Sequence, residues 1–207
     1  EMQEFATLIG EEVSALPAGP TRESLLGLAE ELEAAIASKV DPSAVARITG
    51  DMSRTLLVST SLSTAPAEIP NLSTVDTLYA AQCAACHGVA GAGDGPAGAS
   101  LEPAPTDFTD PARARERSLY GLYNTITLGV EGTGMIAFPQ LSAEERWALA
   151  FYTGGLHVDA GVEARGEQIF EQRRGGLLPS LQDVTTSRLA DVAARLGESE
   201  ASLYAWL

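Results

Sequence analysis

The feature that most constrains this chain is the run Cys83-Ala84-Ala85-Cys86-His87. It contains both cysteines of the 207-residue sequence and one of its two histidines. Cys83 and Cys86 lie about one helical turn apart, so both sulfurs can reach the two vinyl groups on one edge of a porphyrin. His87 follows at once, and its imidazole can bind the iron from one face. The run therefore predicts one covalently attached haem c.

Two other chemistries use closely spaced cysteines. A thioredoxin-like redox pair belongs in a β-α-β setting, and the flanking sequence shows no alternation of strand and helix patterns. A zinc site needs two further nitrogen or sulfur ligands, and the one other candidate in this chain is His157. The sequence therefore favours haem attachment over both alternatives.

Met135 is the candidate for the second axial ligand of the iron. It lies in residues 132–139, a glycine-containing loop ahead of a predicted helix, whereas Met2 and Met52 fit the core of predicted helices. A thioether opposite a histidine raises the reduction potential of a haem, and a second histidine lowers it. We predict Met135 as the ligand, with His157 as its competitor.

Three segments around these residues carry a family resemblance. Residues 78–82 lead into the cysteines, residues 91–96 follow the histidine with a glycine-rich loop, and residues 141–152 form a predicted closing helix. Together, residues 74–156 resemble a class I cytochrome c domain. The resemblance implies an all-α fold, a single haem, and one-electron transfer between its ferric and ferrous states. Ile136 departs from the family pattern, which often has proline after the ligand methionine.

A narrower resemblance rests on residues 94–96, 103–111 and 122–130. This combination is similar to the periplasmic cytochrome c portion fused ahead of bacterial high-affinity iron permeases, as are residues 1–5 and 163–167. It implies a periplasmic protein, tethered to the inner membrane through a following membrane domain, with iron ions and an iron permease as partners. The permease signature Arg-Glu-x-x-Glu does not occur in this sequence, so we expect the chain to be the soluble part.

The charge of the chain limits its partners. A formal net charge of −15 argues against binding to nucleic acid or to anionic membrane surfaces, because both require basic patches. No run approaches the roughly 18 apolar residues that a membrane-spanning helix needs. We therefore expect a redox partner protein and cations rather than nucleic acid. Arg113, Arg115 and Arg117 form a basic island, for which a haem propionate or the solvent is the expected partner.

The chain divides by composition into four parts. Residues 1–60 predict an N-terminal helical bundle, residues 61–73 a Ser-, Thr- and Pro-rich linker, residues 74–156 the cytochrome c domain, and residues 157–207 a short helical tail. The expected caps of the bundle helices are Thr21 and Asp41, the latter followed by proline. The apolar positions with helical spacing in the bundle are Phe5, Leu8, Ile9, Val13 and Leu16; Leu25, Leu28, Leu32, Ala35 and Ile36; and Val45, Ile48, Met52, Leu56 and Leu57.

Smaller signals fix local features. Ser142 and Glu145 predict a capping box for the closing helix, and Ser118 to Leu128 predict a helix that ends at Gly129. A proline carbonyl, from Pro96, Pro103 or Pro105, is expected to accept the N–H of His87. Residues 164–170 look like the start of a second cytochrome c domain, but residues 173–176 contain no second Cys-x-x-Cys-His run, so the haem count stays at one.

The functional prediction is therefore one-electron transfer at a single haem, coupled to iron oxidation and uptake by a permease. Two alternatives stay open. One is a respiratory electron shuttle, which does not need an N-terminal bundle. The other is a haem-based sensor or binding module, in which Met135 leaves the iron and a gas or peroxide takes its place. Glu4 and Glu11, about two helical turns apart, suit a hard cation but also an ordinary solvated helix face.

Overall fold

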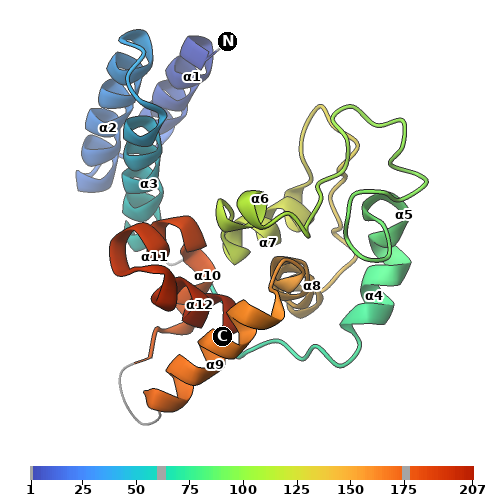
Figure 1. Cartoon of the computed structure of the whole chain (residues 1–207). Coiled ribbons are helices and arrows are strands. Elements are labelled where there is room, and N and C mark those ends of the chain that lie inside the picture. The colour runs from blue at the N-terminus through green and yellow to red at the C-terminus, as the bar shows by residue number, and fades with distance from the viewer. Residues whose placement is uncertain (1, 60–63, 174–177) are drawn as a thin grey trace. The chain divides into compact units, whose positions relative to one another are not determined.

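The computed structural model describes residues 2–59, 64–173 and 178–207, together with every side chain in those ranges except Leu57 and Val58. The described residues contain helices and no strand, which confirms the predicted all-α class. The chain forms two compact units, residues 1–63 and residues 64–207. Figure 1 shows the helices of each unit.

The first unit consists of three helices joined by short turns, α1 (Met2–Ala15), α2 (Pro20–Ala37) and α3 (Pro42–Ser59). Helix α2 packs against both of the others. The core that joins them is aliphatic, and its buried members lie three, four or seven residues apart along each helix, which places them on one face. These residues are Ala6, Val13, Leu25, Ala29, Leu32, Ala35, Ile48 and Met52.

Two expectations for this bundle were wrong. Met2, Phe5 and Leu8 are 63%, 63% and 49% exposed, because α1 turns Ala6 and Val13 to the core instead, and Leu56 of α3 is 37% exposed. Helix α2 begins at Pro20 rather than after a Thr21 cap, since proline is well suited to the first helical position. The start of α3 is as predicted: Asp41 accepts a hydrogen bond from the backbone N–H of Ser43. Leu57 lies outside the described side chains.

The second unit begins with the helices that surround the predicted haem site. These are α4 (Val75–Gln82), α5 (Ala84–His87), α6 (Pro111–Arg115), α7 (Leu119–Leu128) and α8 (Ala143–Gly155). Helix α8 packs against α4 and α7. Its start has the predicted capping box between Ser142 and Glu145, and α7 has Ser118 as its N-cap and ends at Gly129 as predicted.

Aromatic rings form much of the core between these helices. The ring of Tyr79 on α4 lies 5.1 Å from that of Tyr152 on α8. The Tyr123 ring of α7 stacks on Trp147 of α8 at 4.3 Å. These contacts fix α4 and α7 on α8, and they place the chain segments before and after the haem motif in one packed unit.

The remaining helices belong to the same unit. They are α9 (Ala160–Gln172), α10 (Leu181–Thr186), α11 (Leu189–Leu196) and α12 (Glu198–Trp206). Helices α9 and α12 pack closely, because Gly166 lets the backbone and side chain of α12 approach it at Ser202 and Trp206. The Phe170 ring lies 4.6 Å from the Trp206 ring at the same crossing.

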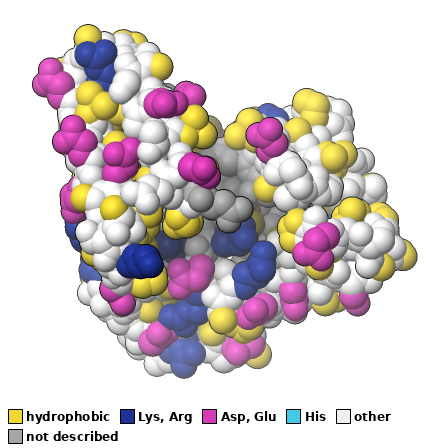
Figure 2. All heavy atoms as spheres, turned by 90° about the horizontal axis from the view of Figure 1, so that it is seen from above, with side chains coloured by type: hydrophobic (Ala, Val, Ile, Leu, Met, Phe, Trp, Pro, Cys, Tyr) yellow, Lys and Arg dark blue, Asp and Glu magenta, His cyan; other side chains and the backbone are white. Residues whose placement is uncertain are grey.

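The predicted linker is described from residue 64 onward, and residues 60–63 lie outside the described part. Thr64 is buried, and its carbonyl oxygen accepts a hydrogen bond from the Thr185 hydroxyl at 2.9 Å. The linker is thus fastened to α10 at Thr64. No helix within the described ranges is long and apolar enough to cross a membrane. Acidic side chains are spread over the face seen in Figure 2 rather than gathered in one patch.

Candidate haem site

Helix α4 delivers the Cys-x-x-Cys-His run through a continuous backbone turn. The N–H of Cys83 donates to the carbonyl of Tyr79 at 2.8 Å, at the end of α4. The buried Tyr79 hydroxyl donates to the carbonyl of Gly88 at 2.9 Å, so one side chain ties the helix before the run to the residue after it. Burial raises the pKa of this phenol, which keeps it a donor. The run is therefore held at both ends.

The run itself forms the short helix α5. The backbone N–H of His87 donates to the Cys83 carbonyl at 2.9 Å, which is the helical turn that the sequence spacing predicts. The thiols of Cys83 and Cys86 are free and partly buried. Burial, with the nearby Cys86, raises the pKa of Cys83 to about 11. Both sulfurs thus lie on one turn, and the raised pKa keeps Cys83 a neutral thiol.

The loop after the histidine folds back over this turn. The N–H groups of Gly93, Gly95 and Ala97 donate to the carbonyls of His87, Cys86 and Ala85, at 2.8, 3.1 and 2.9 Å respectively. A Cβ at Gly95 would lie 2.5 Å from the Ala85 carbonyl oxygen and from the Cys86 carbonyl carbon. Glycine is therefore required at residue 95, because the backbone of Ala85 and Cys86 leaves no room for a side chain there.

The imidazole of His87 is oriented from its Nδ1 side. Nδ1 lies 3.1 Å from the carbonyl oxygen of Thr106, and the ring stacks on Phe108 at 4.6 Å. Nδ1 donates to that carbonyl, so the lone pair of Nε2 is left for a metal. Burial lowers the pKa of His87, which favours the neutral form that ligates. The acceptor is the Thr106 carbonyl and not one from Pro96, Pro103 or Pro105, so that expectation was wrong.

Met135 lies in a loop that is fixed by its own hydrogen bonds. Its N–H donates to the Thr133 hydroxyl at 3.1 Å, and its carbonyl accepts from the Val130 N–H at 2.8 Å. The partly buried side chain packs against the same core cluster as Cys83. Leu101, in the loop that follows the glycine segment, contacts Gly134 beside it. The structure therefore joins Met135 and the Cys-x-x-Cys-His run through one core.

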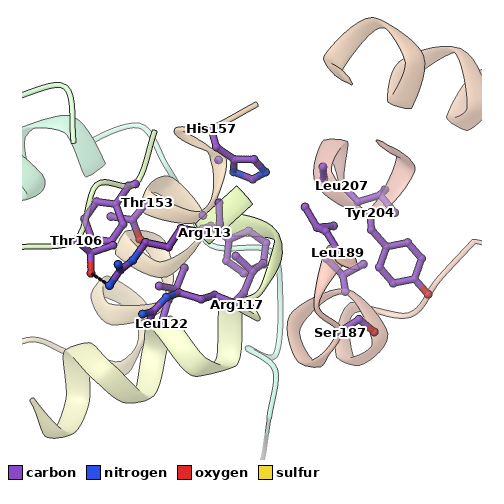
Figure 3. A pocket seen from close by; sticks show the side chains of 18 of the residues that line it. Thr106, Arg113, Arg117, Leu122, Thr153, His157, Ser187, Leu189, Tyr204 and Leu207 are labelled. Atoms are coloured by element: carbon purple, nitrogen blue, oxygen red, sulfur yellow. Dashed lines mark hydrogen bonds between the residues drawn. The ribbon is translucent and has the colours of Figure 1, made fainter. Parts of the chain in front are cut away.

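His157 occupies a different place. It follows α8 and lines a cavity together with Arg113 and Arg117, as Figure 3 shows. Phe108 lines the same cavity. None of the described residues that line this cavity is Cys83, Cys86 or Met135. His157 thus shares this cavity with Thr106 and Phe108, the residues that orient His87, and not with Cys83, Cys86 or Met135.

The comparisons with known proteins agree with this geometry. Residues 73–156 match the family model of cytochrome c. Residues 73–156 form a cytochrome c domain. No curated protein and no solved structure matches the chain. A cytochrome c domain carries covalently attached haem c, and a single domain of this kind takes one haem.

The residues of this cytochrome c domain fit that cofactor. Two unpaired thiols lie on one helical turn, the imidazole beside them has its Nδ1 occupied, and the glycines of the return loop leave no room for side chains against the turn. Neither Thr106 nor Phe108 could be identified from the sequence, because neither residue type marks a haem site by itself. The available signal for Thr106 was its neighbour Pro105, one of the three expected acceptors.

Proposed function

We propose that Cys83 and Cys86 hold the haem through thioether bonds, and that His87 and Met135 bind its iron on opposite faces. When bound, the haem supplies a one-electron couple. The observation that supports this assignment most is the fixed orientation of His87, with Nδ1 directed to the Thr106 carbonyl at 3.1 Å. Because one nitrogen is occupied as a donor, the other is the metal-binding atom.

The protein's own groups suit electron transfer rather than bond making. Phe108 and Thr106 restrict the His87 ring, and the bonds at Val130 and Thr133 restrict the loop of Met135. Ligands that are held in both oxidation states need little rearrangement when an electron arrives or leaves. The domain therefore serves as an electron carrier, which is the function common to cytochrome c domains with a histidine and a methionine on the iron.

We further propose that the donor of the electron is ferrous iron and that the protein works in the periplasm, tethered beside an iron permease. One ferrous ion would lose an electron to the ferric haem, and the ferric ion would pass to the permease. Support comes from the resemblance of residues 94–96, 103–111 and 122–130 to cytochromes fused to such permeases, and from the net charge of −15, which attracts cations.

A preformed iron site does not contribute to this support. Within residues 2–59, 64–173 and 178–207, no group of three or more His, Cys, Asp or Glu side chains could hold a metal ion. Iron oxidation would therefore take place by encounter at the acidic surface and not at a closed ferroxidase centre.

Stopped-flow mixing of the ferric holoprotein with ferrous iron, without oxygen, tests the proposal. We expect the haem to be reduced at a rate that rises with the concentration of ferrous iron. Ascorbate serves as the control, since it shows that the haem is reducible. Reduction by ascorbate with none by ferrous iron would contradict the iron proposal and leave an electron shuttle with another donor, such as a respiratory protein.

A further inference from the structure

The cavity beside His157 is not part of the haem ligand set. It measures about 90 Å³, which is the space of roughly three water molecules. One wall belongs to the cytochrome c domain and includes Thr106, Phe108 and the two arginines Arg113 and Arg117. The opposite wall comes from α11 and α12 and is largely apolar, with Leu189, the ring of Tyr204 and Leu207 (Figure 3).

Two positive charges meet at this cavity. Arg113 lies in α6 and Arg117 lies two residues past the end of that helix, and in Figure 3 both side chains extend toward the Thr106 side of the cavity. Partial burial, together with the charge of Arg113, lowers the pKa of Arg117. The net charge of the chain is −15, yet no described carboxylate forms an ion pair with either guanidinium. The five arginines that do pair with carboxylates in the described residues are Arg47, Arg54, Arg115, Arg173 and Arg188.

The carboxylate nearest to the cavity is already engaged. Asp107 lines the cavity, and its Oδ1 accepts hydrogen bonds from the Thr109 hydroxyl at 2.6 Å and the Thr109 N–H at 2.8 Å. Nη2 of Arg113 donates to the hydroxyl of Thr106 at 3.2 Å, and the charge of Arg113 also contributes to a lowered pKa of Asp107, after the hydrogen bonds from Thr109. Several N–H donors of both guanidiniums therefore remain for a ligand.

We propose that this cavity binds a small organic carboxylate, with Arg113 and Arg117 as its anchors and the apolar lining of the cavity, which includes Leu122 and Leu189, against its apolar part. A guanidinium offers two parallel donors that match the geometry of a carboxylate. The apolar wall suits a short hydrocarbon end and disfavours a fully polar anion such as phosphate. The volume limits the ligand to a few heavy atoms.

The site is linked to the haem ligand through one residue. Thr106 accepts from Arg113 through its hydroxyl and from His87 through its carbonyl. A negative charge at Arg113 would therefore favour the ferric over the ferrous haem, and by linkage the ferric protein would bind the carboxylate more tightly. This second step depends on the proposed ligation by His87, whereas carboxylate binding does not.

Calorimetric titration of the holoprotein with acetate tests the binding step. We expect saturable binding, at least tenfold weaker in Arg113→Gln and in Arg117→Gln, because each loses a charge-assisted hydrogen bond. Arg54→Gln is the matched control, since it removes the same charge in the other unit, and it should bind as tightly as the wild type. In a separate potentiometric titration, acetate should lower the midpoint potential of the wild type but not of Arg113→Gln.

Three results would overturn the proposal. One is the absence of saturable acetate binding in the wild type, which is also the result if a haem propionate fills the site. Another is equal affinity in the wild type and both cavity variants. The third is binding of inorganic phosphate without binding of acetate. None of these results bears on reduction of the haem by ferrous iron, so the two proposals fail separately.

Discussion

The N-terminal bundle and the cytochrome c domain reach a folded state by different means. The bundle has three helices of 14, 18 and 18 residues and an aliphatic core. In the cytochrome c domain, α4, α5 and α6 have 8, 4 and 5 residues, and a long loop, residues 88–110, separates α5 from α6. Helices this short are not stable by themselves in water.

The difference lies in what fixes the backbone. In the bundle, apolar faces pack along whole helices, so the sequence pattern carries most of the information. In the cytochrome c domain, the loops are fixed by backbone hydrogen bonds such as Gly93 to His87 and Phe108 to Gly91, and by side chains such as Tyr79 and Thr133. We therefore expect the loop-rich domain to depend on its haem for part of its stability, and the bundle to be independent of it.

The sharpest test of this contrast removes both thiols. The double variant Cys83→Ser, Cys86→Ser should lose all covalently bound haem, because serine cannot form the thioether bonds. Denaturing mass spectrometry of the intact chain would show the loss of the haem mass. The cytochrome c domain should then unfold at a lower denaturant concentration than in the wild type, while the unfolding midpoint of the N-terminal bundle should stay the same. Haem that stays covalently bound would contradict the assignment of the attachment site.

Core truncations should separate the two units. Leu32 in the bundle and Leu149 in α8 are both buried, and replacing either with alanine should cost about 3 kcal/mol of the free energy of unfolding. Both tryptophans, Trp147 and Trp206, lie in the second unit, so their fluorescence reports on that unit alone. Leu149→Ala should shift the fluorescence transition.

Leu32→Ala is the matched control for the other unit. It should shift the bundle transition seen by circular dichroism and leave the tryptophan transition in place. A tryptophan transition that moves by the same amount in Leu32→Ala would show that the units unfold together, and the contrast between them would be lost.

Glycine replacements should have opposite signs in the two regions. At Gly27, an exposed residue within α2, a Cβ meets nothing within 4 Å, so Gly27→Ala should stabilise the bundle by about 0.5–1 kcal/mol. At Gly95 the Cβ would meet the carbonyls of Ala85 and Cys86, so Gly95→Ala should destabilise the second unit by about 1–3 kcal/mol. Denaturant titrations of each variant give the comparison. A neutral Gly95→Ala would mean that the return loop does not constrain the haem turn.

The smallest expected effect is a pH dependence at the start of α8. The backbone N–H and hydroxyl of Ser142 lower the pKa of Glu145 below its usual value of 4.5. The ionised carboxylate therefore stabilises the folded state above pH 4.5, and this contribution is lost as the pH falls through the lowered pKa. Unfolding of Glu145→Gln, followed from neutral to acidic pH, should show a smaller loss of stability than the wild type. Identical pH profiles would exclude a role for this cap in acid stability.

Sequence alone predicted the helical parts well and the loops less well. The all-α class, the capping box at Ser142 and the end of α7 at Gly129 depend on local patterns that tertiary structure left unchanged. The buried face of α1 was predicted less well, because the spacing of its apolar residues is compatible with burial of either of two adjacent helix faces. The structure buries Ala6 and leaves Phe5 exposed.

The candidate haem site likewise combines features that local sequence predicts and features that depend on tertiary structure. The run from Cys83 to His87 is a local signal, and its spacing was enough to predict haem attachment. The roles of Thr106 and Phe108 depend on how a glycine- and proline-rich loop returns to the histidine, 19 residues further along the chain in the case of Thr106. The Arg113 and Arg117 cavity requires α11 and α12 as well, and nothing in the sequence predicts that these helices lie opposite it.

The most direct test of the central claim, a haem ligated by His87 and Met135, is the far-red absorption spectrum of the ferric holoprotein. A methionine sulfur on ferric haem gives a weak charge-transfer band in this region. We expect the band in the wild type, its loss in Met135→Ala, and its retention in His157→Ala. A wild type without the band, or a band that survives Met135→Ala, would contradict the assignment, and an open or bis-histidine site would then favour the sensor function.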